Sequence, residues 1–249
     1  MKLSITAAER RSFVSLAIAI SLGLSLSILF SWQANAETVV RFQPPEGNAP
    51  GGTRGGASRG DTVCIQNSSE QNQLLRALIP PGSNYGLTLA ERPEVFAYIP
   101  TTTARQAWFV LKDDRGNTLH QHIIPIAGHG RVIPINITEH LPALEVGKTY
   151  EWGIALLCAG RLQIDSPFTS AWVQRIAPST EVLPYMNQPP SLQKVAALGA
   201  QGIWYDMLST LTQLQLSRQD PANVSTWSQL LRSVGLGDVS TVPIERTYK

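Results

Sequence analysis

The hydrophobic pattern of this chain changes once, near Pro178, and that change limits the folds available to it. Before Pro178, apolar residues come in short runs rich in β-branched and aromatic side chains, as is typical of strands. After it, they recur at helical spacing. We therefore predict an α+β fold. An antiparallel β-sandwich of about five to seven strands, similar to immunoglobulin or fibronectin domains, spans residues 62–177, and a helical region spans residues 178–249.

Short apolar runs bounded by turn residues predict the individual strands. Lys112–Asn117 is a polar segment with a glycine near its end, so it predicts a hairpin turn between two of the runs. Pro134 and Gly153 stand inside runs, which predicts a bulge or an edge position at each. The runs are Val95–Ile99, Ala107–Leu111, Thr118–Ile126, Arg131–Ile137, Thr149–Leu156 and Ala171–Ile176.

Beyond Pro178 the sequence predicts a short helix beginning near Ser179 and then a series of amphipathic helices. The last two flank an Asp220-Pro221 turn and predict an antiparallel helical hairpin. Such a pair cannot bury its own apolar face, so we expect it to pack on the sandwich or on a partner. The amphipathic segments begin near Ser191, Ile203 and Val224, with glycines at positions 199, 202, 235 and 237 interrupting or ending them.

The N-terminal segment has the three parts of an export signal. Positive charges at Lys2, Arg10 and Arg11 precede an apolar run over residues 13–30, and Ala34-Asn35-Ala36 is a small-x-small site. We predict a signal peptide over residues 1–36, cleaved after Ala36. The mature chain then has no membrane span and works in the periplasm or outside the cell. An uncleaved signal that anchors the chain in the inner membrane is the alternative, because the run is about as long as a bilayer core is thick.

Residues 37–61 read as a Gly/Pro-rich arm, with six glycines and three prolines between Arg41 and Asp61. This composition cannot bury enough apolar surface to order itself, so it predicts a tether or a segment that wraps a neighbouring domain. Loss of residues 1–36 leaves 17 basic and 17 acidic residues of the original 20 and 18. This balance argues against nucleic acid as a partner, because nucleic-acid binders carry a basic surplus.

Cys64 and Cys158 are the only cysteines, and neither stands in a C-x-x-C pair. This spacing excludes zinc-ribbon and thioredoxin-like sites. In an exported chain the two predict a single disulfide, with two free buried thiols as the alternative.

Three matches to functional motifs predict loops rather than chemistry. Gly56–Gly60 fits the G-x-S-x-G pattern of hydrolases, but no strand precedes its serine. Gly147-Lys148-Thr149 resembles the end of a phosphate-binding loop, yet Pro142 stands where the first glycine is required. Asp113, Asp114 and Asn117 share one turn but lack the spacing of a calcium loop.

Four histidines raise the question of a metal site. His120 and His122 face the same side of a predicted strand, and with His129 or His140 they could approach zinc. No carboxylate has a companion spacing, so we interpret them as solvent-facing. The sequence predicts no catalytic residue, no cofactor and no metal ligand.

The tryptophans could form a sugar-stacking platform, but most lie inside apolar patterns and are better explained as core residues. If a glycan site exists, we expect it to use exposed aromatic side chains such as Tyr85, Tyr98 or Trp172. The tryptophans concerned are Trp108, Trp152, Trp172, Trp204 and Trp227.

Four parts of the sequence resemble a family of exported cyanobacterial proteins, grouped as domain of unknown function 928. The resemblance implies export and a two-part layout, and it brings no catalytic residues. It rests on Arg41–Pro45, on Thr53–Gly60 running into Cys64, on the Leu144–Trp152 pattern, and on Gly202–Leu208 with the later Leu230–Leu236.

From these observations we expect an exported, non-catalytic module of the cell envelope whose helical hairpin, with the arm, contacts a protein. A carbohydrate-binding or envelope-structural module is the alternative, with a glycan as the partner. A third hypothesis is a metal-dependent hydrolase that uses His120 and His122.

Overall fold

The structure is a computed structural model of the chain, and it describes residues 39–45, 64–66, 74–137, 143–217 and 220–245. The chain divides into two compact units, Met1–Glu37 and Thr38–Lys249, and every described residue belongs to the second. The signal peptide over residues 1–36, its cleavage after Ala36 and most of the Gly/Pro-rich arm are predictions that lie outside the described residues.

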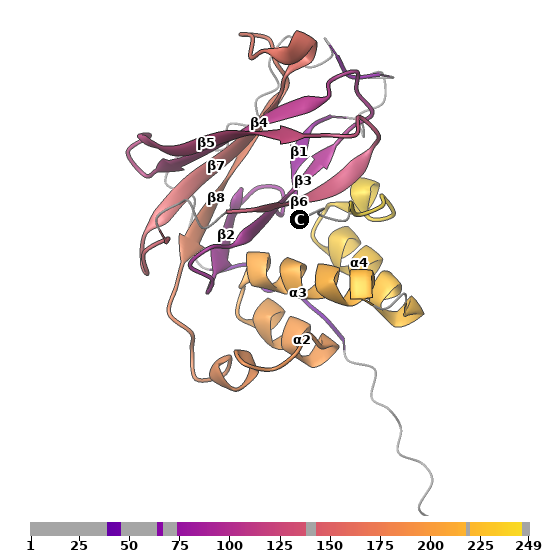
Figure 1. The fold of residues 1–249 in the computed structure, drawn as a ribbon. Helices are drawn as coiled ribbons and strands as arrows, with labels where there is room; N and C mark the ends of the chain where they lie inside the picture. The colour runs from indigo at the N-terminus through magenta and orange to yellow at the C-terminus, as the bar shows by residue number, and fades with distance from the viewer. Residues whose placement is uncertain (1–38, 46–63, 67–73, 138–142, 218–219, 246–249) are drawn as a thin grey trace, which may run out of the picture. The chain divides into compact units, whose positions relative to one another are not determined.

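Two sheets make up the strand region of the described chain (Figure 1). The smaller has the order β1 (Arg76–Ala77), β3 (Glu94–Ile99), β6 (Arg131–Asn136). The larger has the order β2 (Tyr85–Thr88), β8 (Phe168–Arg175), β7 (Thr149–Leu156), β4 (Gln106–Asp113), β5 (Thr118–Pro125). The predicted α+β class is confirmed, and each strand run named from the sequence corresponds to one of these strands.

The prediction of purely antiparallel pairing is wrong at one place, because β2 pairs parallel with β8 in the register Tyr85 to Trp172. Pro134 lies in β6, an edge strand of its sheet, as predicted. Gly153 lies in the central strand β7, where the ladder is regular, and the irregularity falls at Leu111 in β4 instead. A Cβ at Gly153 would lie 2.7 Å from the Phe168 ring, so the glycine makes room for that side chain.

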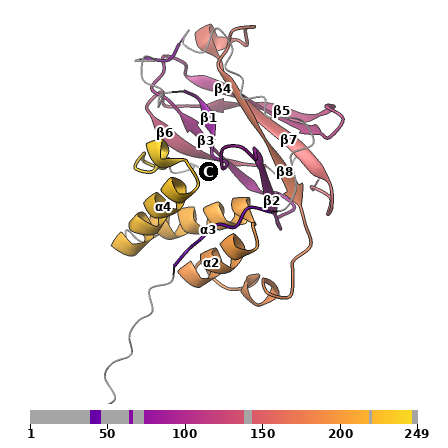
Figure 2. The same cartoon turned by 180° about the vertical axis from the view of Figure 1, so that it is seen from behind.

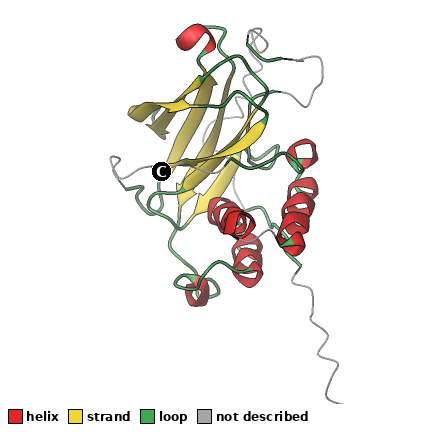
Figure 3. Ribbon diagram, turned by 45° about the vertical axis from the view of Figure 1, so that its right-hand side comes forward, coloured by secondary structure: helices red, strands yellow, loops and turns green. Residues whose placement is uncertain are grey.

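Three helices follow the strands: α2 (Leu192–Ala200), α3 (Trp204–Ser217) and α4 (Pro221–Ser233). Ser191 caps α2 by accepting a hydrogen bond from the Lys194 amide, and Asp220 caps α4 with Pro221 at the first helical position. The short helix expected near Ser179 is the 3₁₀ turn η2 (Leu183–Tyr185), and two further 3₁₀ turns are η1 (Cys158–Gly160) and η3 (Gly237–Val239). Figure 3 shows the three longest helices gathered on one side of the strands, with one short helical turn at the opposite end.

One hydrophobic core joins both sheets to the helices. Its largest fully buried side chains include Trp152 of β7 and Trp204 and Tyr205 of α3. The Trp152 Nε1–H donates to the Tyr205 hydroxyl at 2.8 Å, and that hydroxyl donates to the Trp172 carbonyl at 3.0 Å. The helices therefore pack on the strands, as expected for a helical pair too small to bury its own face.

A segment far away in sequence packs against the connection between α2 and α3. We call Val39–Pro45 the N-terminal strap; it passes beside both helices in Figure 2. The Gln43 amide donates to the Gly199 carbonyl at 2.9 Å. The Phe42 ring meets Trp204 edge-on, with the ring centroids 4.7 Å apart. This part of the predicted arm is thus a structural element of the domain.

Candidate functional site

A pocket of about 420 Å³ lies where the strand region meets the helices. Its walls are the connection from β2 to β3, the segment around η2, and the helices α2 and α3. This volume is within the range of small-molecule sites in proteins. The charged and hydroxyl side chains that line it include those of Thr88, Arg92, Glu94, Lys194, Asp206 and Ser209.

Asp206 stands in the first turn of α3 and connects that helix to the end of β2. Its Oδ2 accepts hydrogen bonds from the Thr88 hydroxyl at 2.7 Å and from the Leu89 amide at 3.0 Å. Removal from water raises the pKa of this carboxyl group, although these two donors act in the opposite direction. The backbone amides of Asp206 itself and of Ala90 also lower this pKa in part.

Glu94 is the second acidic group of the pocket. It is the first residue of β3, where it pairs with Asn136 of the edge strand β6. Burial raises the pKa of its carboxyl group, and a hydrogen bond from Ser209 of α3 lowers it in part. The pocket therefore holds two carboxylates that are both partly shielded from water.

The two basic side chains of the pocket form contacts outside its acidic pair, although the buried Arg92 Nε has no hydrogen-bond partner in the part of the chain that the structure describes. Arg92 Nη1 donates to Glu91 Oε1 at 2.9 Å. The Lys194 ammonium donates to the carbonyl oxygens of Met186 at 3.3 Å and Gln188 at 3.1 Å. Within the described residues, no ion pair reaches Glu94 or Asp206. The pocket thus has two acidic groups without a direct ion pair in the described part of the chain.

His120 and His122 of β5 lie together, with His120 Nε2 and His122 Nδ1 3.0 Å apart. Their prediction as solvent-facing residues is wrong in part, because both are partly buried and His122 packs against Phe109. Burial and the neighbouring His120 lower the pKa of His122. His129 is exposed, and His140 lies outside the described residues. The described residues contain no group of three or more candidate metal ligands.

The motif matches within the described part are turns, as predicted. Asp113 Oδ1 accepts hydrogen bonds from the Arg115 and Asn117 amides at 3.0 and 2.8 Å, which closes the hairpin between β4 and β5. Gly147 has a φ of 85° in the turn before β7, and the Lys148 ammonium pairs with Glu145. The Gly56–Gly60 match lies outside the described residues.

The aromatic residues named for a glycan site are buried, so that expectation is wrong. Tyr85 and Tyr98 are 7% exposed and Trp172 is 9% exposed. Tyr85 and Trp172 pack against each other across the β2–β8 pair with Leu87. Core packing is confirmed for Trp152, Trp172, Trp204 and Trp227, whereas Trp108 is half-buried.

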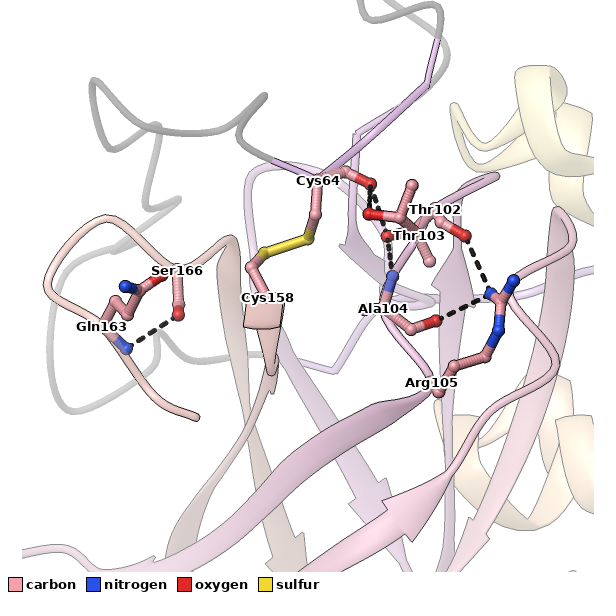
Figure 4. Close-up of a disulfide and its surroundings, with 8 residues drawn as sticks. All are labelled: Cys64, Thr102, Thr103, Ala104, Arg105, Cys158, Gln163 and Ser166. Carbon is pink, nitrogen blue, oxygen red and sulfur yellow. Dashed lines mark hydrogen bonds between the residues drawn. A yellow bond between two sulfur atoms is a disulfide. The ribbon is translucent and has the colours of Figure 1, made fainter. Parts of the chain in front are cut away.

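The predicted disulfide joins Cys64 to Cys158, and no described cysteine is free (Figure 4). It connects the start of the domain to η1, directly after the core strand β7. The Cys64 carbonyl also accepts hydrogen bonds from the Thr102 hydroxyl at 2.6 Å and the Thr103 amide at 2.9 Å. None of the described helices is long and apolar enough to cross a bilayer.

The sequence interpretation missed the pocket. Glu94 begins a strand and Asp206 lies inside an apolar helical pattern, and nothing in their spacing connects them. One signal was present: Asp206 is an acidic residue between the buried Tyr205 and Met207. A carboxylate at such a position needs a partner in the fold.

A comparison with protein families identifies one match. The family model described as Domain of Unknown Function (DUF928) covers residues 51–244, which is more than half of the chain. No curated protein matches the chain.

Proposed function

Because the chain belongs to the DUF928 family, to which no activity is attached, we propose a function from the geometry of its pocket. The protein is an exported, non-catalytic binding module of the cell envelope, and the pocket at Asp206 and Glu94 holds a small polar ligand. The two sheets act as a sandwich-like body that supports this site. The observation that carries the proposal is the pocket itself, about 420 Å³ in volume and lined by charged and hydroxyl side chains from both strands and helices.

The disulfide and the predicted N-terminal signal support the part of the proposal that places the protein outside the cytoplasm. Disulfides persist in oxidising spaces such as the periplasm and are rare in the cytosol. The Cys64–Cys158 bond therefore supports a site of action outside the cytoplasm. Intact mass of the protein recovered from cells tests this part. We expect the loss of residues 1–36 and a mass increase of about two hydrogens on reduction, whereas a full-length chain with free thiols contradicts it.

Binding is tested by filling the pocket. Ala90 lines the pocket, so we expect Ala90→Trp to occupy part of the space. Ala127 is exposed and does not line the pocket, which makes Ala127→Trp the matched control. Native mass spectrometry, after incubation with the small-molecule fraction of an envelope extract, should detect a bound compound on wild type and Ala127→Trp and not on Ala90→Trp. Equal retention by all three variants contradicts the pocket as the site.

If the protein is not an enzyme, it must leave the bound compound chemically unchanged. The compound must be released with the same mass and structure that it had in the extract after prolonged incubation. Conversion of the compound by wild type, absent in Ala90→Trp, would instead indicate an enzyme whose two carboxylates act as acid and base.

A further inference from the structure

The two pocket carboxylates have no cationic side chain as a partner among the described residues. Two basic side chains also line the pocket: Arg92 pairs with Glu91 through Nη1, although its buried Nε has no partner in the described part of the chain, and the Lys194 ammonium donates to two backbone carbonyls. Charges that are withdrawn from water are normally paired, because the desolvation cost is otherwise not offset. Glu94 and Asp206 have hydrogen-bond donors but no ion-pair partner among the described residues.

We propose, building on the binding function above, that the pocket binds a small molecule with a primary ammonium group, which lies between Glu94 and Asp206. An ammonium group has three donors and no acceptor, which matches a pair of carboxylate acceptors. Ser209 and Thr210 also line the pocket, and their hydroxyl oxygens can accept a further hydrogen bond.

The size and the apolar walls of the pocket distinguish an organic amine from a bare cation. About 420 Å³ is far more than one ion occupies. Leu89, Val182 and Leu198 line the pocket together with the polar groups, and such side chains can cover a carbon skeleton. Calcium prefers six to eight oxygen ligands, whereas no group of three or more candidate metal-ligating side chains occurs in the described part of the chain.

The burial of Glu94 and Asp206 determines whether binding of an ammonium group takes up or releases protons. The pKa values of Glu94 and Asp206 are both raised above their ordinary range by loss of water. An ammonium group between them favours the ionised forms and lowers both pKa values again. Binding should therefore release protons in weakly acidic buffer and should weaken as the pH falls. The other titratable side chains that line the pocket are Arg92, Tyr185, Lys194 and Tyr205.

A pair of isosteric probes tests the proposal. Butylammonium and 1-butanol share a carbon chain and differ in the charge of the terminal group. The reporter is the backbone amide resonance of Leu89, which donates to Asp206. We expect butylammonium to shift this resonance saturably and 1-butanol to bind at least about tenfold more weakly, as expected for a lost charged hydrogen bond. Binding of butylammonium should weaken from about pH 8 to about pH 5, as the raised carboxyl pKa values require.

Substitutions identify the residues that bind. Asp206→Asn keeps an oxygen for the Thr88 and Leu89 donors and removes the charge, and Glu94→Gln does the same at the second carboxylate. Each should weaken butylammonium binding about tenfold or more. Asp165 is exposed and lies outside the pocket, so Asp165→Asn is the matched control and should bind like wild type. Thermal unfolding of each variant checks that the fold is retained.

Several outcomes would overturn the ammonium assignment. If both probes bind equally, the pocket remains a binding site but its ligand is not selected by charge. If neither probe shifts the Leu89 amide, the assignment fails, and the extract experiment alone judges the broader function. If calcium chloride shifts the resonance and butylammonium does not, the carboxylates hold a metal instead.

Discussion

The substitution Gly199→Ala tests whether the strap contact outweighs helix propensity. Helix propensity predicts a higher free energy of unfolding for the variant, whereas the strap contact predicts a lower one. Gly199 lies in the last turn of α2, where alanine is favoured over glycine by about 1 kcal/mol. A Cβ at this position, however, would lie 2.5 Å from the Arg41 carbonyl oxygen and 2.9 Å from the Met207 sulfur. The methionine side chain can rotate away. The Arg41 oxygen belongs to the backbone of the strap, so the strap itself must move.

The cost of that movement follows from the strap contacts. The hydrogen bond from Gln43 to Gly199 contributes about 0.5–1.5 kcal/mol. The edge-on pair of Phe42 and Trp204 contributes a similar amount beyond its buried area, and exposing the Phe42 ring, which is only partly buried, costs on the order of 1 kcal/mol more. Against the gain of about 1 kcal/mol from propensity, we expect Gly199→Ala to lower the free energy of unfolding by about 2 kcal/mol.

Urea unfolding measures the free energy, and hydrogen exchange of the Gln43 amide reports on the strap directly. In the Phe42→Ala background the strap is already weakened, so Gly199→Ala should cost much less there. A double-mutant cycle then gives the coupling. The reasoning is refuted if Gly199→Ala raises the stability of the protein, or if the Gln43 amide stays as protected as in wild type.

Three further outcomes follow from the core and the pocket. Replacing Cys64 and Cys158 together by serine should cost about 4–5 kcal/mol, the chain-entropy value for a loop of roughly 100 residues, and denaturant titration measures it. Tyr205→Phe should lower the free energy of unfolding by about 2 kcal/mol in the same assay, because it leaves the Trp152 indole N–H without its acceptor. The raised pKa of Asp206 means that the folded protein binds this proton more tightly than the unfolded chain does. Its contribution to stability therefore falls as the pH rises from the ordinary value of 3.8 through the raised value. Asp206→Asn should remove that part of the pH dependence, and an unchanged profile contradicts it.

Local patterns were enough to locate most strands and all three helices. The hairpin of β4 and β5 was recognisable because its turn carries its own donors and acceptors around Asp113. The helix ends were recognisable because Asp220 and Pro221 cap α4. These features act over a few residues, so a single sequence contains them completely.

Contacts between distant segments were not recognisable in the same way. β2 is short, contains Gly86 and pairs with β8, more than eighty residues later. The need for glycine at position 86 is visible only in the folded protein, because a Cβ there would lie 2.9 Å from the Tyr205 ring. The disulfide was predictable because only one pairing of two cysteines exists within the chain, whereas Tyr98 is buried in a core that joins segments distant in sequence.

The segments that carry the family resemblance meet around the helix that bears the pocket carboxylate. The strap segment Arg41–Pro45 contacts α3 through Phe42 and Trp204. The Leu144–Trp152 segment contacts it through the hydrogen bond from Trp152 to Tyr205. These contacts hold Trp204 and Tyr205, the first two residues of α3, and Asp206 is the next residue along the helix. A displacement of either segment would therefore move Asp206 relative to Thr88 and change the pocket without touching it. For this reason the strand region and the helical region are better regarded as one packed unit, which shares a single hydrophobic core.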